Sequence, residues 1–183
     1  MMDVVAALSE LELLPQPQIA RVLLLLRAFT AAEDSEVPSG IEGLAKIAVL
    51  DFLLRYPNIL ERALIAKHAS VKLLEVQTYE RGGVDANLAQ FRFAPWDNTV
   101  RRTLLELVGM RLVQLQSTGH GITVSLTDSG STLASELASM ETYGSMAQRA
   151  SAIKSKLNIS VGSLIKFMYA TFPELVALRR QVQ

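Results

Sequence analysis

Cysteine is absent from this sequence, which excludes disulfide bonds, thiolate metal ligands and a cysteine nucleophile. A protein without disulfides suits a reducing compartment, so we expect it in the cytoplasm. The first residues are apolar and acidic with no basic stretch, which is not the pattern of a secretory signal. An apolar run such as Val22–Leu26 is far shorter than the roughly 20 residues that a membrane-spanning helix needs.

An excess of one charge is also missing, because eighteen basic residues balance eighteen acidic ones. A protein that its own charge holds on DNA normally carries a basic excess, so DNA contact would have to use a local patch. Half of the residues are hydrophobic and the mean hydropathy is +0.27, which is high for a soluble monomer. We therefore expect a well-formed core and, in addition, apolar surface that a partner covers.

Catalytic motifs are missing as well. The two histidines, His68 and His120, have no carboxylate or second ligand beside them in the sequence. No HExxH, GxSxG, GxxxxGK[ST] or GxGxxG sequence occurs, so the usual signatures of metal, nucleophile and phosphate sites are lacking. The sequence predicts a protein that is not an enzyme, with no catalytic residues, no metal site and no cofactor. An enzyme subunit with a site shared between chains is a weaker alternative.

The strongest positive pattern is a β-hairpin between Val113 and Leu126. Apolar residues alternate with polar ones on both sides of a glycine-rich turn at Ser117–Gly121. Thr127 then supplies an oxygen that can accept from the free backbone N–H groups of a following helix. A helix, a hairpin and a closing helix in this order make up the second half of a winged helix-turn-helix domain.

Helical periodicity fills most of the remaining chain. Predicted helices cover Ile19–Phe29, Ile41–Tyr56, a stretch from Leu60 to Leu74, Val100–Gly109, Met146–Leu157, Ser160–Tyr169 and the residues from Pro173 on. Pro57 should stop or break the second of these helices, and Ser160 is a candidate for the cap of the helix that it opens. The predicted fold class is therefore mainly α with a small β-hairpin. We expect one compact unit with a winged helix-turn-helix core at 41–140, an N-terminal helix and loop at 1–40, and a C-terminal helical extension at 141–183.

Four arginines are candidates for DNA contact. Arg101 and Arg102 lie at the start of the predicted recognition helix, where side chains can meet phosphates or base edges. Arg111 precedes the hairpin, and Arg92 lies on a stretch that looks extended. The hairpin itself carries no Lys or Arg to follow the phosphate backbone, so solvated or partner-paired arginines are the alternative interpretation.

Protein partners have their own candidate residues. The helix predicted at Ile19–Phe29 is apolar on most sides, so it is either a core helix or a helix whose second apolar face docks onto a partner. Trp96 stands at a turn and either packs there or lies at the centre of an interface. The predicted partner-binding residues are Arg21, Leu25, Trp96, Phe167 and Phe172.

Three segments together resemble a known family. They are IEGLAKIAVLDFLLRYPNILERAL at Ile41–Leu64, FRFAPWD at Phe91–Asp97 and VGSLIKFMYATFPEL at Val161–Leu175. The combination is similar to the middle component of bacterial ABC-three-component defence systems, which are related to the Lamassu-type antiphage systems. The resemblance implies a small subunit that links a large ATPase of the Rad50 or structural-maintenance-of-chromosomes (SMC) type to an effector subunit, often a nuclease.

Two hypotheses follow from the sequence. The first is a non-catalytic bridging subunit of an antiphage defence complex, with the SMC-like ATPase and the effector nuclease as partners and with DNA reached, if at all, through the complex. The second is a stand-alone winged-helix transcriptional regulator that binds DNA. Both predict a protein that does not contact a membrane.

Overall fold

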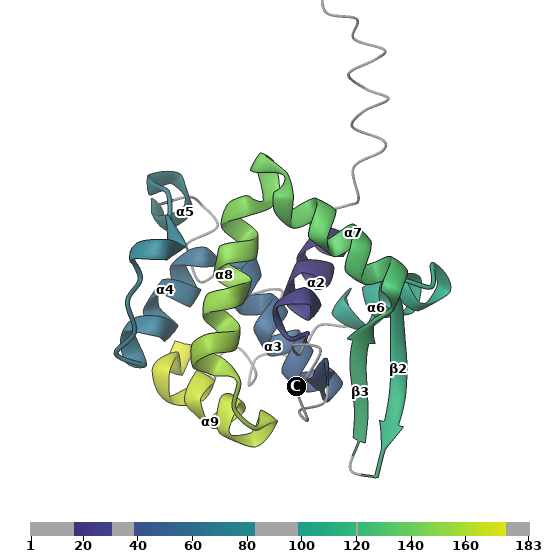
Figure 1. Cartoon of the computed structure of the whole chain (residues 1–183). Helices are drawn as coiled ribbons and strands as arrows, with labels where there is room; N and C mark the ends of the chain where they lie inside the picture. The colour runs from purple at the N-terminus through teal and green to yellow at the C-terminus, as the bar shows by residue number, and fades with distance from the viewer. Residues whose placement is uncertain (1–16, 31–38, 83–98, 120, 175–183) are drawn as a thin grey trace, which may run out of the picture.

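The computed structural model describes residues 17–30, 39–82, 99–119 and 121–174 of the chain, which are mainly helical with one small antiparallel sheet. This confirms the predicted fold at the level of its class (Figure 1). The elements in order are α2 (Pro17–Ala28), β1 (Ile41–Glu42), α3 (Leu44–Arg55), α4 (Pro57–Ala66), a 3₁₀ turn η1 (Lys72–Leu74), α5 (Thr78–Gly82), α6 (Thr99–Gly109), β2 (Val113–Thr118), β3 (Gly121–Leu126), α7 (Asp128–Ser139), α8 (Glu141–Leu157) and α9 (Val161–Thr171).

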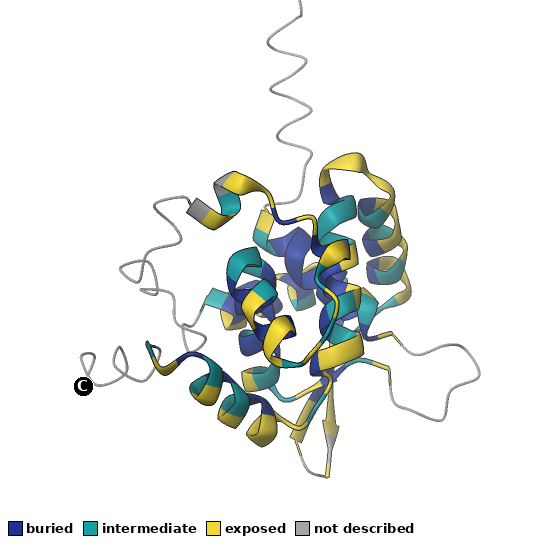
Figure 2. Ribbon diagram, turned by 90° about the vertical axis from the view of Figure 1, so that its left-hand side faces the viewer, coloured by how far each residue is buried: buried dark blue, intermediate teal, exposed yellow. Residues whose placement is uncertain are grey.

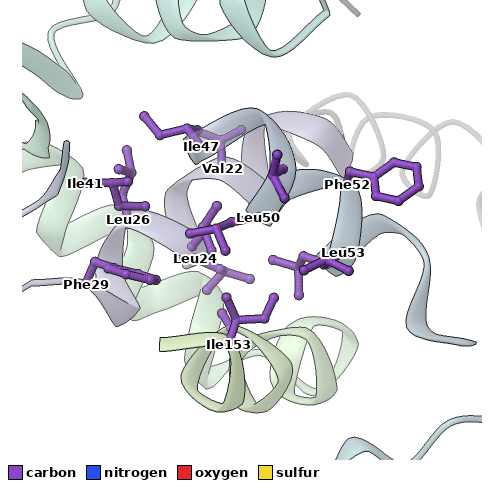
Figure 3. Close-up of a cluster of buried hydrophobic side chains, with 14 of the residues drawn as sticks. Val22, Leu24, Leu26, Phe29, Ile41, Ile47, Leu50, Phe52, Leu53 and Ile153 are labelled. Carbon is purple, nitrogen blue, oxygen red and sulfur yellow. The ribbon is translucent and has the colours of Figure 1, made fainter. Parts of the chain in front are cut away.

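Helix α2 is the centre of the core. Every residue from Ile19 to Leu26 is buried, because the helix contacts α3, α6, α7 and α8 on its different sides. Leu24 and Leu26 lie among side chains of α3 and α8, including Leu50 and Ile153 (Figure 3). A helix that is apolar all round must be enclosed, and here other elements of the same chain enclose it. The core-helix interpretation of this segment is therefore the correct one.

One ion pair lies inside this core. The Arg21 guanidinium of α2 donates to the Asp51 carboxylate of α3, from Nε to Oδ1 at 2.6 Å and from Nη2 to Oδ2 at 3.2 Å. Both side chains are nearly fully buried. A buried charge is tolerated when an opposite charge and hydrogen bonds compensate the lost water, and this pair supplies both. It fixes how α2 lies against α3.

The sheet has three strands in the order β1-β3-β2. The hairpin predicted from the alternation is confirmed, with Val113 opposite Leu126 and Leu115 opposite Val124. The prediction that Ile41 starts a helix is wrong, because Ile41 pairs with Val124 as part of β1. Gly43, at a φ of 88°, then turns the chain into α3, and the N–H of Gly43 donates to the Ile122 carbonyl at 2.8 Å. A positive φ favours glycine, so the turn occurs at this residue.

Two helices begin at the caps that the sequence predicted, and a third begins where only a helix end was expected. Thr127 caps α7 by accepting from the N–H of Gly130, and Ser160 caps α9 in the same manner from Ser163, as predicted. Pro57 was expected to stop a helix, but it also begins α4, because the first helical turn needs no N–H donor from its first residue. The stretch predicted from Leu60 to Leu74 is interrupted after α4, where His68 has a φ of 53°.

Burial follows the layering of the helices. Figure 2 shows the buried residues gathered in the middle of the molecule and the exposed residues on the outer faces of the helices and on the hairpin. None of the helices within the described ranges is both long and apolar enough to cross a membrane. The extended stretch predicted at 89–93, the tip residue His120 and the helix predicted beyond Glu174 lie outside the described residues.

Candidate interaction surface

Helix α6 carries an exposed stripe in which arginines flank an apolar side chain. Its buried residues, Val100, Thr103, Leu104 and Leu107, face α2 and α3, while Arg101, Arg102, Leu105 and Glu106 are exposed. Spacings of three and four residues place these exposed side chains on one face of the helix. Leu105 is 60% exposed, so it adds apolar area to this face.

The turn after α6 extends this surface. Met110 is 59% exposed, and Arg111 is exposed with a φ of 59°. The backbone there is held in place, since the Thr127 hydroxyl donates to the Arg111 carbonyl at 2.7 Å and the N–H of Leu112 donates to the carbonyl of Leu107. The Arg111 backbone is therefore fixed while its side chain is exposed. We call Arg101, Arg102, Leu105, Met110 and Arg111 the α6 surface.

The arginines of the α6 surface differ from those elsewhere in the fold. The guanidinium groups of Arg101, Arg102 and Arg111 make no hydrogen bond or ion pair with another residue in the described ranges. Glu106 lies four residues after Arg102, but no ion pair joins them in this part of the chain. Guanidinium groups that meet no counter-charge in this part of the chain favour an acidic partner.

Two exposed arginines outside this surface, Arg81 and Arg62, are paired with acids within the chain. Arg81 forms a fork with Glu61, with Nη2 to Oε1 at 2.7 Å, and this hydrogen bond, together with the charge of Glu61, raises the pKa of Arg81. Arg62 pairs with Glu174 at 2.8 Å. These arginines already have an internal acid, so they present less unbalanced charge to a partner than the α6 surface does.

The hairpin continues from the α6 surface without charge. No Lys, Arg, Asp or Glu occurs from Val113 to Thr127. On one face of the hairpin Val113 and Val124 are buried, whereas Leu115 and Ile122 towards the tip are 42% and 40% exposed. The apolar face thus reaches beyond the core that covers its base.

The nearest cation on the α3 side of the hairpin is partly buried. The Lys46 ammonium donates to Asn158 Oδ1 at 2.8 Å and lies 5.8 Å from the centre of the Phe29 ring. Burial lowers the pKa of Lys46, and the nearby Glu42 carboxylate opposes this effect. Because its ammonium group is already engaged, Lys46 does not supply the free cation that the hairpin lacks.

Three of the predicted partner-binding residues lie in the interior. Leu25 and Phe172 are completely buried, and Arg21 is occupied by Asp51. These residues therefore cannot contact a partner in this structure, and that prediction is corrected. The apolar character of α2 and of the C-terminal end of α9 reflects core packing instead.

Phe167 has an intermediate position. It is partly buried in α9, with the Lys67 ammonium of α4 at 4.6 Å from the centre of its ring. Such a cation–π contact covers an aromatic ring without a partner protein. Arg92 and Trp96 lie outside the described residues.

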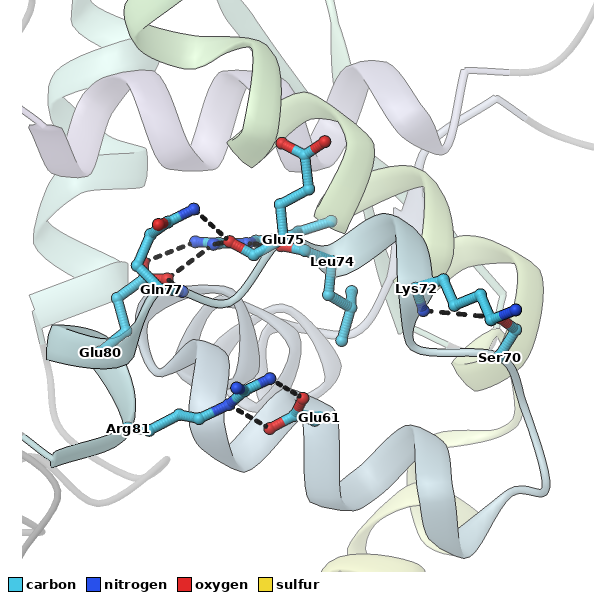
Figure 4. A network of polar contacts seen from close by, with 9 residues as sticks. Glu61, Ser70, Lys72, Leu74, Glu75, Gln77, Glu80 and Arg81 are labelled. Atoms are coloured by element: carbon cyan, nitrogen blue, oxygen red, sulfur yellow. Dashed lines mark hydrogen bonds and ion pairs between the residues drawn. The ribbon is translucent and has the colours of Figure 1, made fainter.

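A polar network that the sequence did not reveal joins α8 to η1, α5 and the residues between them (Figure 4). Arg149 is buried and donates to both oxygens of the Glu80 carboxylate, at 2.9 and 2.8 Å, and to the carbonyls of Leu74 and Glu75. The same carboxylate accepts from the N–H of Gln77 at 2.8 Å. The acceptors are 69 to 75 residues from Arg149 in the sequence, so no local pattern could reveal the contact. Every group in it is used in holding the fold.

Two further findings bear on function. Within the described residues, no three His, Cys, Asp or Glu side chains come together as a metal site would require. In the comparisons with known proteins, no family model, no curated protein and no solved structure matches the chain.

Proposed function

We propose that the chain is a non-catalytic winged-helix adaptor that binds a protein partner through the α6 surface. The order of elements supports the winged-helix assignment. Helices α2, α3 and α6 contact one another, β1 lies between the first two, and the hairpin follows the third. The first strand pairs with the last, which is the strand order that such a domain requires.

This assignment shifts the proposed core toward the N-terminus. Helix α2 takes the place of the first helix, so the core runs from Pro17 to Leu126 instead of beginning at Ile41. Helices α4 and α5 are an insertion between the second and third helices. Helix α6 becomes the recognition helix, the element with which helix-turn-helix domains meet their ligands.

One observation carries the choice of a protein partner: the α6 surface combines the exposed apolar side chains of Leu105 and Met110 with arginines that have no ion pair among the described residues. Protein interfaces are enriched in Met and Arg and in apolar groups at their centres, whereas DNA-binding surfaces are mainly basic. Charge complementarity assigns the partner an apolar patch bordered by Asp and Glu. The family resemblance suggests that this partner is the SMC-like ATPase, which the adaptor links to an effector nuclease in antiphage defence.

The experiment is co-purification of the full chain with the products of the genes adjacent to its own, each co-expressed and tagged; the proposal expects an SMC-like ATPase and an effector nuclease among them. Leu105→Glu should reduce capture at least about tenfold, because it buries an unpaired charge at the centre of an interface. Ile65→Glu on α4 is the matched control, since Ile65 is 57% exposed and Leu105 is 60% exposed. Equal capture of both variants and the unaltered chain would contradict the proposal.

A stand-alone DNA-binding regulator is the second candidate, which the exposure of Arg101 and Arg102 at the start of α6 favours. It predicts salt-dependent binding of the chain alone to a short palindromic duplex. Arg101→Ala with Arg102→Ala should then abolish the shift of the duplex in a gel. The uncharged hairpin argues against this candidate, because a wing that follows DNA normally places a cation at the phosphates.

A further inference from the structure

Strand β2 forms a free edge of the sheet. Among the described residues it pairs only with β3, and in the strand order β1-β3-β2 it is the outermost strand. Figure 1 shows β2 on the outer side of the hairpin, away from α2 and α3. A sheet edge exposes a row of unpaired N–H and C=O groups, to which another strand can hydrogen-bond.

Two backbone hydrogen bonds show which groups of β2 point outward. The Ile122 carbonyl accepts from Gly43 on the β1 side, so the backbone groups of Ile122 face away from β2. The Leu112 carbonyl accepts from the N–H of Thr127, so the even-numbered residues of β2 face β3. Because the direction alternates along a strand, the N–H and C=O groups of Val113, Leu115 and Ser117 point to the free edge.

This edge lacks the usual protection against pairing. Natural edge strands carry Lys, Pro or a bulge, or are covered by another element. Strand β2, with the sequence VQLQST, contains neither a charge nor a proline, and its pairing with β3 is continuous from Val113 to Thr118. Leu115 and Ile122 add exposed apolar surface near the hairpin tip. They lie on the same face of the hairpin as the buried side chains of Val113 and Val124.

We propose that β2 pairs antiparallel with β2 of a second copy of this chain. Strand β2 is complementary to itself when Leu115 lies opposite Leu115 of the second copy. In that register Val113 lies opposite Ser117 of the second copy, and Gln114 lies opposite Gln116 of the second copy. All the outward-pointing groups then find partners, the glutamine amides can hydrogen-bond to each other, and no like charges meet.

Pairing in this register would create a continuous sheet across a two-fold axis. The exposed Leu115 side chains of the two copies would lie next to each other and would extend the apolar face that Ile122 belongs to. A contact of one strand is small for a protein interface, so we expect a weak dimer whose population rises with concentration. This inference uses the hairpin edge and does not depend on the α6 surface.

The first test removes one backbone N–H group that points to the free edge of β2. Ser117→Pro removes an N–H that does not take part in the β2–β3 pairing, so the hairpin should remain intact. By symmetry it removes two hydrogen bonds from the dimer, and we expect the dissociation constant from sedimentation velocity to rise about tenfold or more. Ser117→Ala keeps the N–H and is the matched control, while circular dichroism checks that both variants fold.

The second test locates the two-fold axis. Because the chain has no cysteine, Leu115→Cys introduces a single thiol, and antiparallel neighbours about 5.5 Å apart at Cα permit a disulfide. Mild oxidation should give a covalent dimer with Leu115→Cys but not with Gln148→Cys on the exposed side of α8. The proposal is overturned if the full chain stays monomeric at high concentration. It is also overturned if Ser117→Pro leaves the dissociation constant unchanged, or if the oxidised Leu115→Cys variant forms no covalent dimer.

Discussion

Gly130 shows how one residue without a side chain sets the junction of the hairpin and α7. A Cβ atom at this position would collide with the backbone carbonyl of Leu112. That carbonyl accepts from the N–H of Thr127, and Thr127 in turn accepts from the N–H of Gly130. The close approach of the backbones therefore depends on glycine, although the conformation of Gly130 is an ordinary helical one.

We expect Gly130→Ala to lower the free energy of unfolding by about 1–3 kcal/mol, because the backbone of Leu112 must move to admit the methyl group. Gly144→Ala in α8 is the matched control, since a Cβ atom there meets nothing within 4 Å. Alanine at this second position should stabilise the helix by up to about 1 kcal/mol. Urea denaturation measures both values, and equal effects would refute the role of the contact.

The sequence also predicted individual caps but not individual partners. Thr127 and Ser160 were recognisable because a cap acts on a backbone N–H only a few residues away. Arg21 was wrongly predicted to bind a partner protein. Its actual partner, Asp51, is thirty residues further along the chain, so no local pattern indicated the pair. The sequence of an apolar helix looks the same whether one of its arginines meets an internal acid or another protein.

At the scale of elements, strong periodicity was sufficient to predict a helix or strand, whereas short elements could not be predicted. Helix α6 and the two hairpin strands follow from their spacing of apolar residues, and the structure confirms them. Strand β1 was missed because two residues carry no periodicity, and it exists only because β3 offers Ile41 a pairing edge. Pairing with β3 therefore outweighed the helical pattern at Ile41 and Glu42.

The segment from η1 to α5 is held in place by hydrogen bonds to Arg149 of α8. Arg149→Met should release it, because the Glu80 carboxylate and the carbonyls of Leu74 and Glu75 lose their donor. We expect faster amide exchange in residues 72–82 and a loss of about 1.5–3 kcal/mol in stability. Exchange monitored by mass spectrometry tests the local effect.

Arg81→Met is the control for this prediction. The Arg81 side chain is 55% exposed, whereas that of Arg149 is 8% exposed. An ion pair at the surface contributes less than about 1 kcal/mol, so this variant should change stability little. A larger effect from Arg81→Met than from Arg149→Met would show that the buried network is not what holds the segment.

For the whole molecule, the high apolar content predicted surface that a partner covers, and most of it instead forms the core. The apolar residues of α2 and α3 enclose each other and pack against α8. The exposed apolar side chains that remain on α6 and the hairpin are few. A protein of this size can bury a large share of its apolar surface by itself, so hydropathy alone could not separate core from interface.

We therefore expect the chain produced alone to unfold in one cooperative transition. Helix α2 contacts elements from both the N-terminal and the C-terminal half, so neither half keeps its core without the other. Scanning calorimetry and far-ultraviolet circular dichroism should give coincident transitions with equal calorimetric and van't Hoff enthalpies. Two separate transitions would indicate that the segments on either side of the hairpin form independent units.

The sequence by itself determined the helices with strong periodicity, the hairpin and its following cap, because these depend on neighbours within a few residues. Tertiary structure decided which apolar faces are core, which arginines are neutralised and that β1 pairs with β3. Those outcomes depend on contacts between residues far apart in the chain, such as Arg21 with Asp51 and Arg149 with Glu80. A local pattern carries no information about which distant group will meet it. Only the folded chain therefore shows that the α6 surface is exposed and that its arginines have no ion pair among the described residues.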